Sequence, residues 1–79
     1  MFLHLGNNYL VKNEDIIGIF DIRNKKTNIY KIFLKPKLEV KDERLVILTD
    51  KYDPSSCIVT KDKIILSAIS SMTLKNRQI

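Results

Sequence analysis

The chain has 79 residues, with 14 lysine and arginine residues against 9 acidic ones and a formal net charge of +5 at pH 7. This length allows one small domain and leaves no room for a deep active-site cleft within one copy. Hydrophobic residues make up 44% and charged residues 29%, which is the balance of an ordinary globular protein and not of a disordered chain. The single cysteine, Cys57, cannot form an internal disulfide. Together with His4 it offers too few ligands for a zinc site, which takes about four.

The apolar segments are too short for a membrane span. The longest purely apolar runs have four residues, such as 45–48, whereas a membrane-spanning helix needs about 20. The N-terminus has no basic segment before its apolar residues and is broken at Gly6, so it is not a secretory signal. One free cysteine and no export signal favour a cytoplasmic location. The sequence thus predicts no membrane partner. Because the chain has neither a disulfide nor a metal site to stabilise so small a domain, we expect it to be stabilised by oligomerisation.

The N-terminal third predicts a hairpin and a strand. Residues 2–5 and 9–12 flank the turn residues Gly6-Asn7-Asn8, which tolerate positive φ, and form a β-hairpin. Residues 16–22 are nearly continuously β-branched, as in a strand that is buried on both faces. Gly18 inside this run indicates a bulge or a close approach of the backbone.

A helix of about two turns is predicted after the basic loop at 23–26. Thr27 or Asn28 can cap its N-terminus. Pro36 is expected to end it, because the residue before a proline is pushed out of the α region. The apolar stripe of this helix has helical spacing and consists of Ile29, Ile32 and Phe33, with Tyr30 and Leu34 as a neighbouring pair.

The remainder of the chain predicts further strands and a short helix. Residues 38–41 alternate and fit a strand or an extended segment, and residues 50–56 form a loop by their Asp, Pro and Ser content. Ser70 or Ser71 can cap a short C-terminal helix. The expected fold is a small β-rich α+β domain over residues 1–79, with short antiparallel strands, one central helix and this short C-terminal helix. Its later strands are expected at residues 44–49, 57–60 and 64–69, the last two as a hairpin.

Blocks near the two ends of the chain carry a family resemblance. The first is Phe2-Leu3-His4-Leu5-Gly6 with Asp15-Ile16-Ile17-Gly18-Ile19-Phe20-Asp21, and the second runs from Ile64 to Arg77. Their order and spacing resemble the bacterial extracellular matrix regulatory protein family, closest to its B branch. The resemblance implies a DNA-associated transcriptional regulator of biofilm and extracellular matrix genes. The sister A branch forms rings that bind DNA through repeated basic contacts, so a homo-oligomer, with a ring as one form, is also implied.

The chain departs from the A branch at two places. That branch carries an arginine before the Ile-Ile strand, where this chain has Glu14-Asp15. It also carries an arginine cluster before the C-terminal strands, where this chain has residues 51–55. The resemblance therefore does not imply DNA contact through the same residues, even where the fold carries over.

Basic residues are the strongest functional signal in the chain. Lysines and arginines that neutralise phosphates release counterions, which drives sequence-tolerant affinity for duplex DNA, and an oligomer would repeat such contacts. The alternative is a solvated lysine-rich face, because +5 is modest for a nucleic-acid binder. The residues that we expect to contact phosphates are Arg23, Lys25, Lys26 and Lys51, with Lys75 and Arg77 as a second group.

Other functions have weaker support. A protein-interaction module that binds another regulator without DNA contact is the main alternative, and the departures at Glu14-Asp15 and Asp53-Pro54 favour it. RNA binding ranks third, because three tyrosines could stack on unpaired bases but are not interleaved with basic residues. An enzyme is not expected, since Cys57 reads as a small buried residue and His4 as a structural one. The sequence suggests no metal, cofactor or small-molecule substrate.

Overall fold

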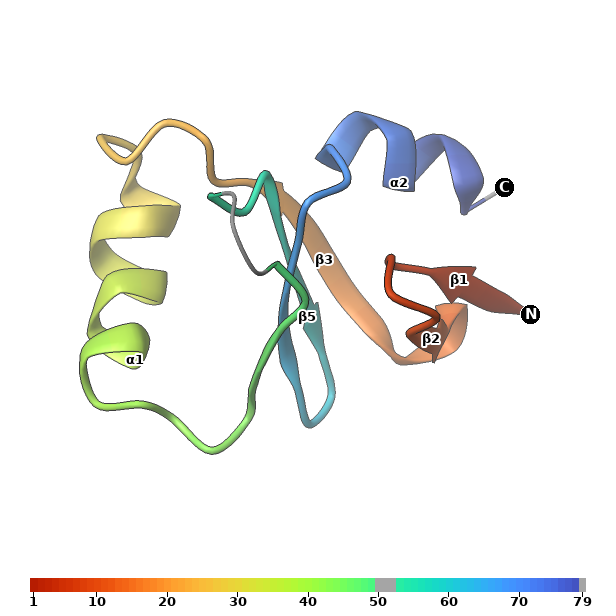
Figure 1. Cartoon of the computed structure of the whole chain (residues 1–79), viewed down its shortest axis with the longest axis horizontal. Coiled ribbons are helices and arrows are strands. Elements are labelled where there is room, and N and C mark those ends of the chain that lie inside the picture. The colour runs from red at the N-terminus through yellow and green to blue at the C-terminus, as the bar shows by residue number, and fades with distance from the viewer. Residues whose placement is uncertain (50–52, 79) are drawn as a thin grey trace.

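A four-stranded sheet forms the middle layer of the computed structural model, which describes residues 1–49 and 53–78. A helix covers one face of this sheet, and a two-stranded hairpin with a C-terminal helix lies against the other (Figure 1). This arrangement confirms the predicted β-rich α+β fold class. In spatial order, the strands of the sheet are β3 (Ile16–Asp21), β5 (Ser56–Thr60), β6 (Ile64–Ser67) and β4 (Leu45–Ile47). The other elements are β1 (Phe2–His4), β2 (Leu10–Lys12), the 3-10 turn η1 (Asn13–Asp15), the π-helix η2 (Ile29–Leu34), α1 (Lys35–Glu39) and α2 (Ser71–Arg77).

The predicted N-terminal hairpin is confirmed. β1 and β2 pair in an antiparallel register that places Leu3 opposite Val11. The turn between them needs residues that accept positive φ, and Gly6, Asn7 and Asn8 adopt φ values of 102°, 49° and 61°. The inner side of the hairpin then brings Leu3 into the core, where it is buried.

The sheet has an apolar core on each face, because alternate residues of its strands point to opposite sides. Adjacent residues of β5 show this division, since Cys57 faces the helix and Ile58 faces the hairpin. On the hairpin side the buried residues are Leu3, Leu5, Ile19, Ile58, Ile65 and Leu74. On the helix side they are Ile22, Leu34, Cys57, Ile64 and Leu66.

A buried hydroxyl joins the hairpin to the sheet. The Ser67 side chain donates to the Leu5 carbonyl at 2.7 Å and accepts the Ile69 amide at 3.0 Å. Ser67 and Leu5 are fully buried and Ile69 is half-buried, so these bonds replace water for the Ser67 hydroxyl and the Leu5 carbonyl. The chain that leaves β6 is thereby attached to the end of the N-terminal hairpin.

The strand predicted at residues 16–22 is β3, but it lies at an edge of the sheet and pairs only with β5 among the described residues. The expectation that both faces are buried is wrong, because Ile17 is 70% exposed and Phe20 is 37% exposed. A β-branched run is equally compatible with an edge strand that presents apolar side chains outward. The bulge predicted at Gly18 is confirmed by a register shift between Ile16 and Gly18. A Cβ at this glycine would lie 2.6 Å from the Phe20 ring, so its absence lets the ring rest on the backbone.

The helix does not end at Pro36, contrary to the prediction. It runs through the π-helix η2 into α1 and ends at Glu39, with the Val40 amide bonded to the Pro36 carbonyl. Proline is tolerated because it lies in the first turn of α1, directly after the π-helical register closes at Lys35, where a missing N–H costs little. The predicted strand at residues 38–41 is therefore also wrong, and Lys41 leaves the helix with φ 53°.

The buried face of this helix differs from the predicted stripe at one position. Leu34 is fully buried, but Ile32 is 71% exposed, because the face is centred on the neighbouring pairs Ile29/Phe33 and Tyr30/Leu34, which pack on the core. Asn28 is the N-cap by position, yet neither predicted cap residue makes a side-chain cap bond. The Thr27 hydroxyl instead donates to the Asn24 carbonyl at 2.9 Å.

The C-terminal hairpin is confirmed as β5 and β6, with Cys57 opposite Leu66. The strand predicted at 44–49 is the shorter β4. It runs parallel to β6, whereas antiparallel strands were expected throughout. The strand order accounts for the parallel pairing. β6 lies between β5 and β4, so β4 joins the sheet beside β6 and not beside β5, although β5 follows β4 in sequence. The predicted cap of α2 is Ser70, whose hydroxyl accepts the Thr73 amide at 3.2 Å.

Candidate nucleic-acid interface

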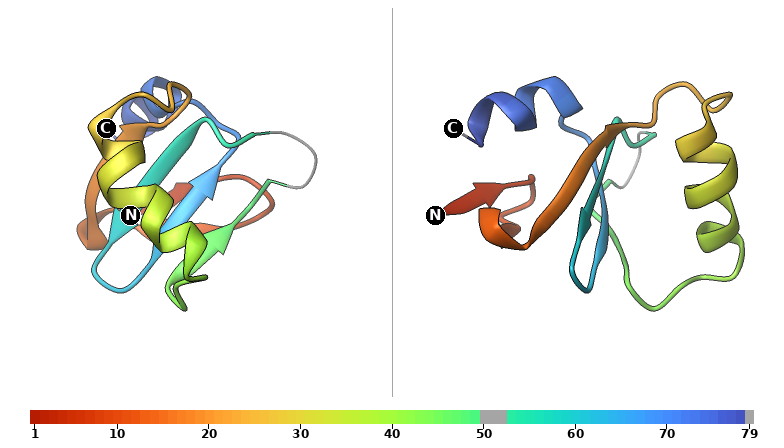
Figure 2. Two further views of the ribbon diagram at one scale, coloured as in Figure 1. Left: turned by 90° about the vertical axis from the view of Figure 1, so that its left-hand side faces the viewer. Right: turned by 180° about the vertical axis from the view of Figure 1, so that it is seen from behind.

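Two of the predicted basic segments lie along the same edge of the molecule, on opposite sides of the sheet. Arg23, Lys25 and Lys26 lie in the loop at 22–28, which leaves β3 toward the helix side, while α2 lies on the hairpin side (Figures 1 and 2). Lys75 and Arg77 are in the last turn of α2. All five side chains are on exposed residues. Lys51, the remaining predicted contact, lies outside the described residues.

Arg23 is held by a carboxylate two residues before it. Its Nη2 lies 2.7 Å from Asp21 Oδ2 and its Nε 3.1 Å from Asp21 Oδ1, while its backbone amide donates to the same carboxylate at 3.0 Å. The Arg23 side chain lowers the pKa of Asp21 to about 2, and the charge of Lys75 acts in the same direction. At neutral pH the carboxylate therefore neutralises much of the charge that Arg23 offers to this surface.

The same Asp-x-Arg arrangement recurs at the opposite end of the helix. Arg44 Nη2 lies 2.8 Å from Asp42 Oδ2, and the Arg44 amide also donates to Asp42. Hydrogen bonds from the Arg44 side chain and amide hold the pKa of Asp42 well below its usual range. In both triplets the carboxylate closes a short turn onto the amide two residues on and then receives the guanidinium. Each arginine is thus paired locally by its own sequence neighbour.

The lysines of this surface are more available. Lys25 places its Nζ 5.8 Å from the centroid of the Tyr30 ring. The Lys26 amide donates to the Asn24 side chain at 2.9 Å, which fixes the turn and leaves the lysine side chain exposed. Within residues 1–49 and 53–78, the ion pairs found do not include Lys25, Lys26, Lys75 or Arg77.

The carboxylates at Glu14 and Asp15 are used within the chain. Asp15 pairs with Lys61 at 3.4 Å, and Glu14 lies 3.7 Å from the N-terminal amine. Both pairs are exposed, so each contributes little to stability. They lie on η1, which precedes β3, whereas the loop at 22–28 follows it, so they do not reduce the positive charge of the candidate surface.

Cys57 and His4 do not form a nucleophile–base pair. Cys57 faces the helix side of the sheet, whereas His4 is exposed on the hairpin that packs on the other side. Burial raises the pKa of the Cys57 thiol to about 11, so the thiol stays protonated at neutral pH. The described residues also contain no group of three His, Cys, Asp or Glu side chains that could hold a metal. None of the described helices is long and apolar enough to cross a membrane.

The family model described as "extracellular matrix regulatory protein A-like" matches residues 2–78. The chain belongs to this family. Extracellular matrix regulatory protein B of Bacillus subtilis (strain 168) is 38% identical over 77 residues, which cover 98% of this chain and 89% of that protein. The resemblance to extracellular matrix regulatory proteins, and to the B branch among them, is confirmed.

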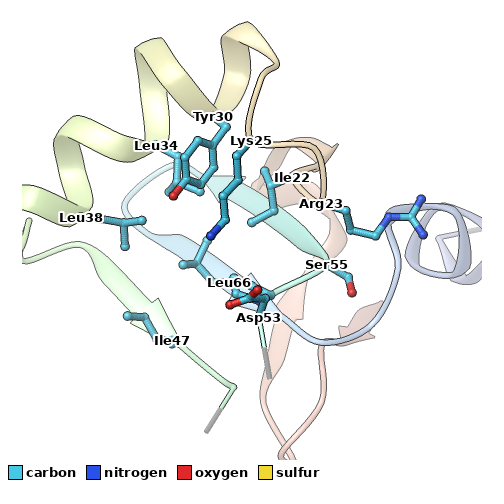
Figure 3. A pocket seen from close by; sticks show the side chains of 11 residues that line it. Ile22, Arg23, Lys25, Tyr30, Leu34, Leu38, Ile47, Asp53, Ser55 and Leu66 are labelled. Carbon is cyan, nitrogen blue, oxygen red and sulfur yellow. The ribbon is translucent and has the colours of Figure 1, made fainter. Parts of the chain in front are cut away.

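A cavity that could not be recognised from the sequence lies beside the candidate interface. It has a volume of about 430 Å³ and lies between the helix and the sheet (Figure 3). Its lining comes from the loop at 22–28, the helix, β4, β6 and residues 53–55. No spacing rule links such distant segments, so only the three-dimensional fold shows the cavity. Two predicted DNA contacts, Arg23 and Lys25, are part of its lining.

Proposed function

We propose that this chain is a cytoplasmic, DNA-associated transcriptional regulator of extracellular matrix genes, which acts as an oligomer and contacts the DNA backbone through basic residues. The observation that carries the proposal is that the loop at 22–28 and α2 both place exposed cations along one edge of the molecule, in a member of the extracellular matrix regulatory family. The charge of Lys75 on α2 acts on Asp21, where the loop begins. The name of the Bacillus subtilis relative supports the regulatory role.

The basic residues along this edge favour contact with phosphates over the reading of bases. Lysine is a compact charge on a flexible stem, and it satisfies a phosphate without demanding one geometry. Base recognition relies most often on a bidentate arginine, and Arg23 is engaged by Asp21. Few contacts per subunit give weak binding, so affinity must come from several copies on one duplex.

Assembly is supported by the two outer strands of the sheet. On β3, the apolar side chain of Ile17 is largely exposed. Both strands have an unpaired edge among the described residues, and unpaired apolar edges are the surfaces through which strands of different copies associate. Two different edges on one subunit fit a head-to-tail contact, which closes into a ring when the rotation between copies allows. Light scattering at micromolar concentration tests this, and a monomer would remove the avidity argument.

A salt titration of binding to a duplex fragment tests DNA contact. We expect the logarithm of affinity to fall linearly with the logarithm of salt concentration, with a slope of about −0.9 for each phosphate neutralised. A double variant, Lys25→Gln with Lys26→Gln, should make the slope shallower by up to about 2 for each bound subunit. Lys63→Gln, in the exposed turn between β5 and β6, is the control and should keep the slope. Absence of binding at low salt, or an affinity for the duplex that does not change with salt concentration, would exclude this function.

A protein-interaction module is the second candidate. The observation that favours it is that Arg23 and Arg44 are both neutralised by carboxylates of the same chain, which limits the charge available for phosphates. Under this alternative the duplex would show no salt-dependent affinity while the chain still assembles. A comparison of duplex DNA with single-stranded RNA at equal salt ranks RNA binding against both.

A further inference from the structure

The cavity between the helix and the sheet has the size of a small-molecule site. Its volume of about 430 Å³ falls in the range of about 300–1,000 Å³ that is typical of ligand pockets. Ile47 of β4 lines the cavity although more than half of its side chain is exposed, so an apolar surface remains uncovered there. The floor of the cavity is apolar and is formed by residues from the helix layer and the sheet layer, namely Ile22, Leu34, Leu38 and Leu66.

The mouth of the cavity is polar. Lys25 and Tyr30 lie together there, and the lysine extends toward the opening past the tyrosine ring (Figure 3). Within the described residues, Lys25 takes part in no ion pair and the Tyr30 hydroxyl makes no hydrogen bond. Arg23 also lines the cavity, but its guanidinium is paired with Asp21. Among the described residues, Lys25 is therefore the cation at the mouth without an ion pair.

We propose that this cavity binds a small amphipathic anion. Its apolar body would occupy the floor, where leaving water is favourable, and its anionic group would lie against Lys25 and the Tyr30 hydroxyl. An ammonium and an anion form a charge-assisted hydrogen bond, which is stronger than a bond between neutral groups. Few polar groups over an apolar floor are the usual composition of a site that orients an amphipathic ligand.

Asp53 sets the orientation of the ligand. Its carboxylate also lines the mouth and repels an anion, so the anionic group is directed toward Lys25 and away from residues 53–55. Asp53→Asn should therefore tighten the binding of an anion and leave the binding of a neutral analogue unchanged. The proposal does not depend on DNA binding, because it is tested on the protein alone.

The test uses the fluorescent anion anilinonaphthalene sulfonate, whose emission rises when its aromatic body leaves water. We expect saturable binding to the folded wild-type protein. Lys25→Gln should weaken it roughly five- to tenfold, the effect of one charge-assisted hydrogen bond at a solvated site, and Lys25→Arg should restore most of the loss. Lys31→Gln, an exposed lysine one residue from Tyr30 that does not line the cavity, should bind as the wild type does.

A second variant tests the location of the dye. Ile47→Trp adds a large side chain at an exposed position that lines the cavity, so it should fill the apolar space without disturbing the core and should abolish the rise in fluorescence. Neutral phenylnaphthylamine should be excluded by Ile47→Trp and should not respond to Lys25→Gln. Equal dye binding by the wild type and Ile47→Trp, or equal losses in Lys25→Gln and Lys31→Gln, would overturn the proposal.

Discussion

An arginine contributes to a basic surface only as far as its neighbours leave its charge available. Arg23 and Arg44 each sit two residues after an aspartate that accepts both their amide and their guanidinium. The count of cationic residues in the sequence therefore overstates the charge that these two positions present. Lys25 and Lys26 are not opposed in this way, and they stand out as the stronger contacts of the loop.

Releasing Arg23 should strengthen DNA binding. In Asp21→Asn the side chain can still accept a hydrogen bond from the Arg23 amide, but it has lost its negative charge. The Arg23 guanidinium therefore becomes free for a phosphate. We expect tighter binding to a duplex and a salt slope that is steeper by up to about 1 for each bound subunit. The matched control is Asp42→Asn, which breaks the same kind of triplet away from the loop at 22–28. Equal effects of the two variants would show that Arg23 has no special position on the interface.

Removing the Ser67 hydroxyl should destabilise the fold. Ser67→Ala leaves the buried Leu5 carbonyl and the Ile69 amide without their partner, and an unsatisfied buried group costs about 1–3 kcal/mol. We expect a lower denaturation midpoint with an unchanged dependence of the unfolding free energy on urea. Ser71→Ala, at the first position of α2, serves as the control and should be nearly neutral. An unchanged midpoint in Ser67→Ala would mean that water replaces the hydroxyl.

At the scale of elements, β3 combines two features that suit an intermolecular edge. It is unpaired on one side, and its bulge turns Ile17 out of the regular pairing into solvent. A bulge normally protects an edge strand by disrupting its pairing. Here the residue released by the bulge is apolar, so the edge offers side-chain contact where it cannot offer a regular hydrogen-bond ladder.

Ile17→Lys should therefore disrupt assembly without harming the subunit. The side chain is largely exposed, so the substitution removes little from the core while it places a charge in the proposed contact. We expect a smaller particle by light scattering and an unchanged circular dichroism spectrum. Val40→Lys, an equally exposed apolar residue in the turn after α1, should leave the size unchanged. Loss of assembly in both variants would indicate a general effect of added charge.

The elements that could be predicted from the sequence are those set by short-range chemistry. The N-terminal turn at Gly6, the bulge at Gly18 and the cap at Ser70 each follow from a local backbone requirement. Pro36 was misleading because its effect depends on whether a π-helical register precedes it. The parallel pairing of β4 could not be predicted, since it depends on which strand occupies the centre of the sheet.

The candidate site was predictable in part for a similar reason. Lysines in a loop can be recognised from composition, and the basic loop at 23–26 is predicted in this way. The pairing of Arg23 depends on the turn that begins at Asp21, in which the carboxylate accepts both the amide and the guanidinium of Arg23. The cavity could not be anticipated, because residues as distant as Lys25 and Leu66 form it together.

At the scale of the whole molecule, the cavity and the DNA surface share Lys25. If both proposed ligands use this lysine, each must weaken the other, and by the same factor, because coupling between two binding equilibria is reciprocal. We expect saturating anilinonaphthalene sulfonate to lower duplex affinity in the wild type. Lys25→Gln should abolish this coupling, and neutral phenylnaphthylamine should not produce it. Dye and duplex that bind independently would show that Lys25 serves only one of them.

The strand order has a consequence for how the chain acquires its structure. The two central strands, β5 and β6, come from the last third of the sequence, while the outer strands β3 and β4 come before them. A tight hairpin such as β5–β6 forms in about 1–10 μs, whereas β3 and β4 have no partner in the sheet until it exists. During synthesis, the first 55 residues thus carry the N-terminal hairpin, the helix, β3 and β4, whose apolar faces remain open until the β5–β6 hairpin leaves the ribosome. Folding of the sheet therefore waits for the β5–β6 hairpin and is then nearly all-or-none.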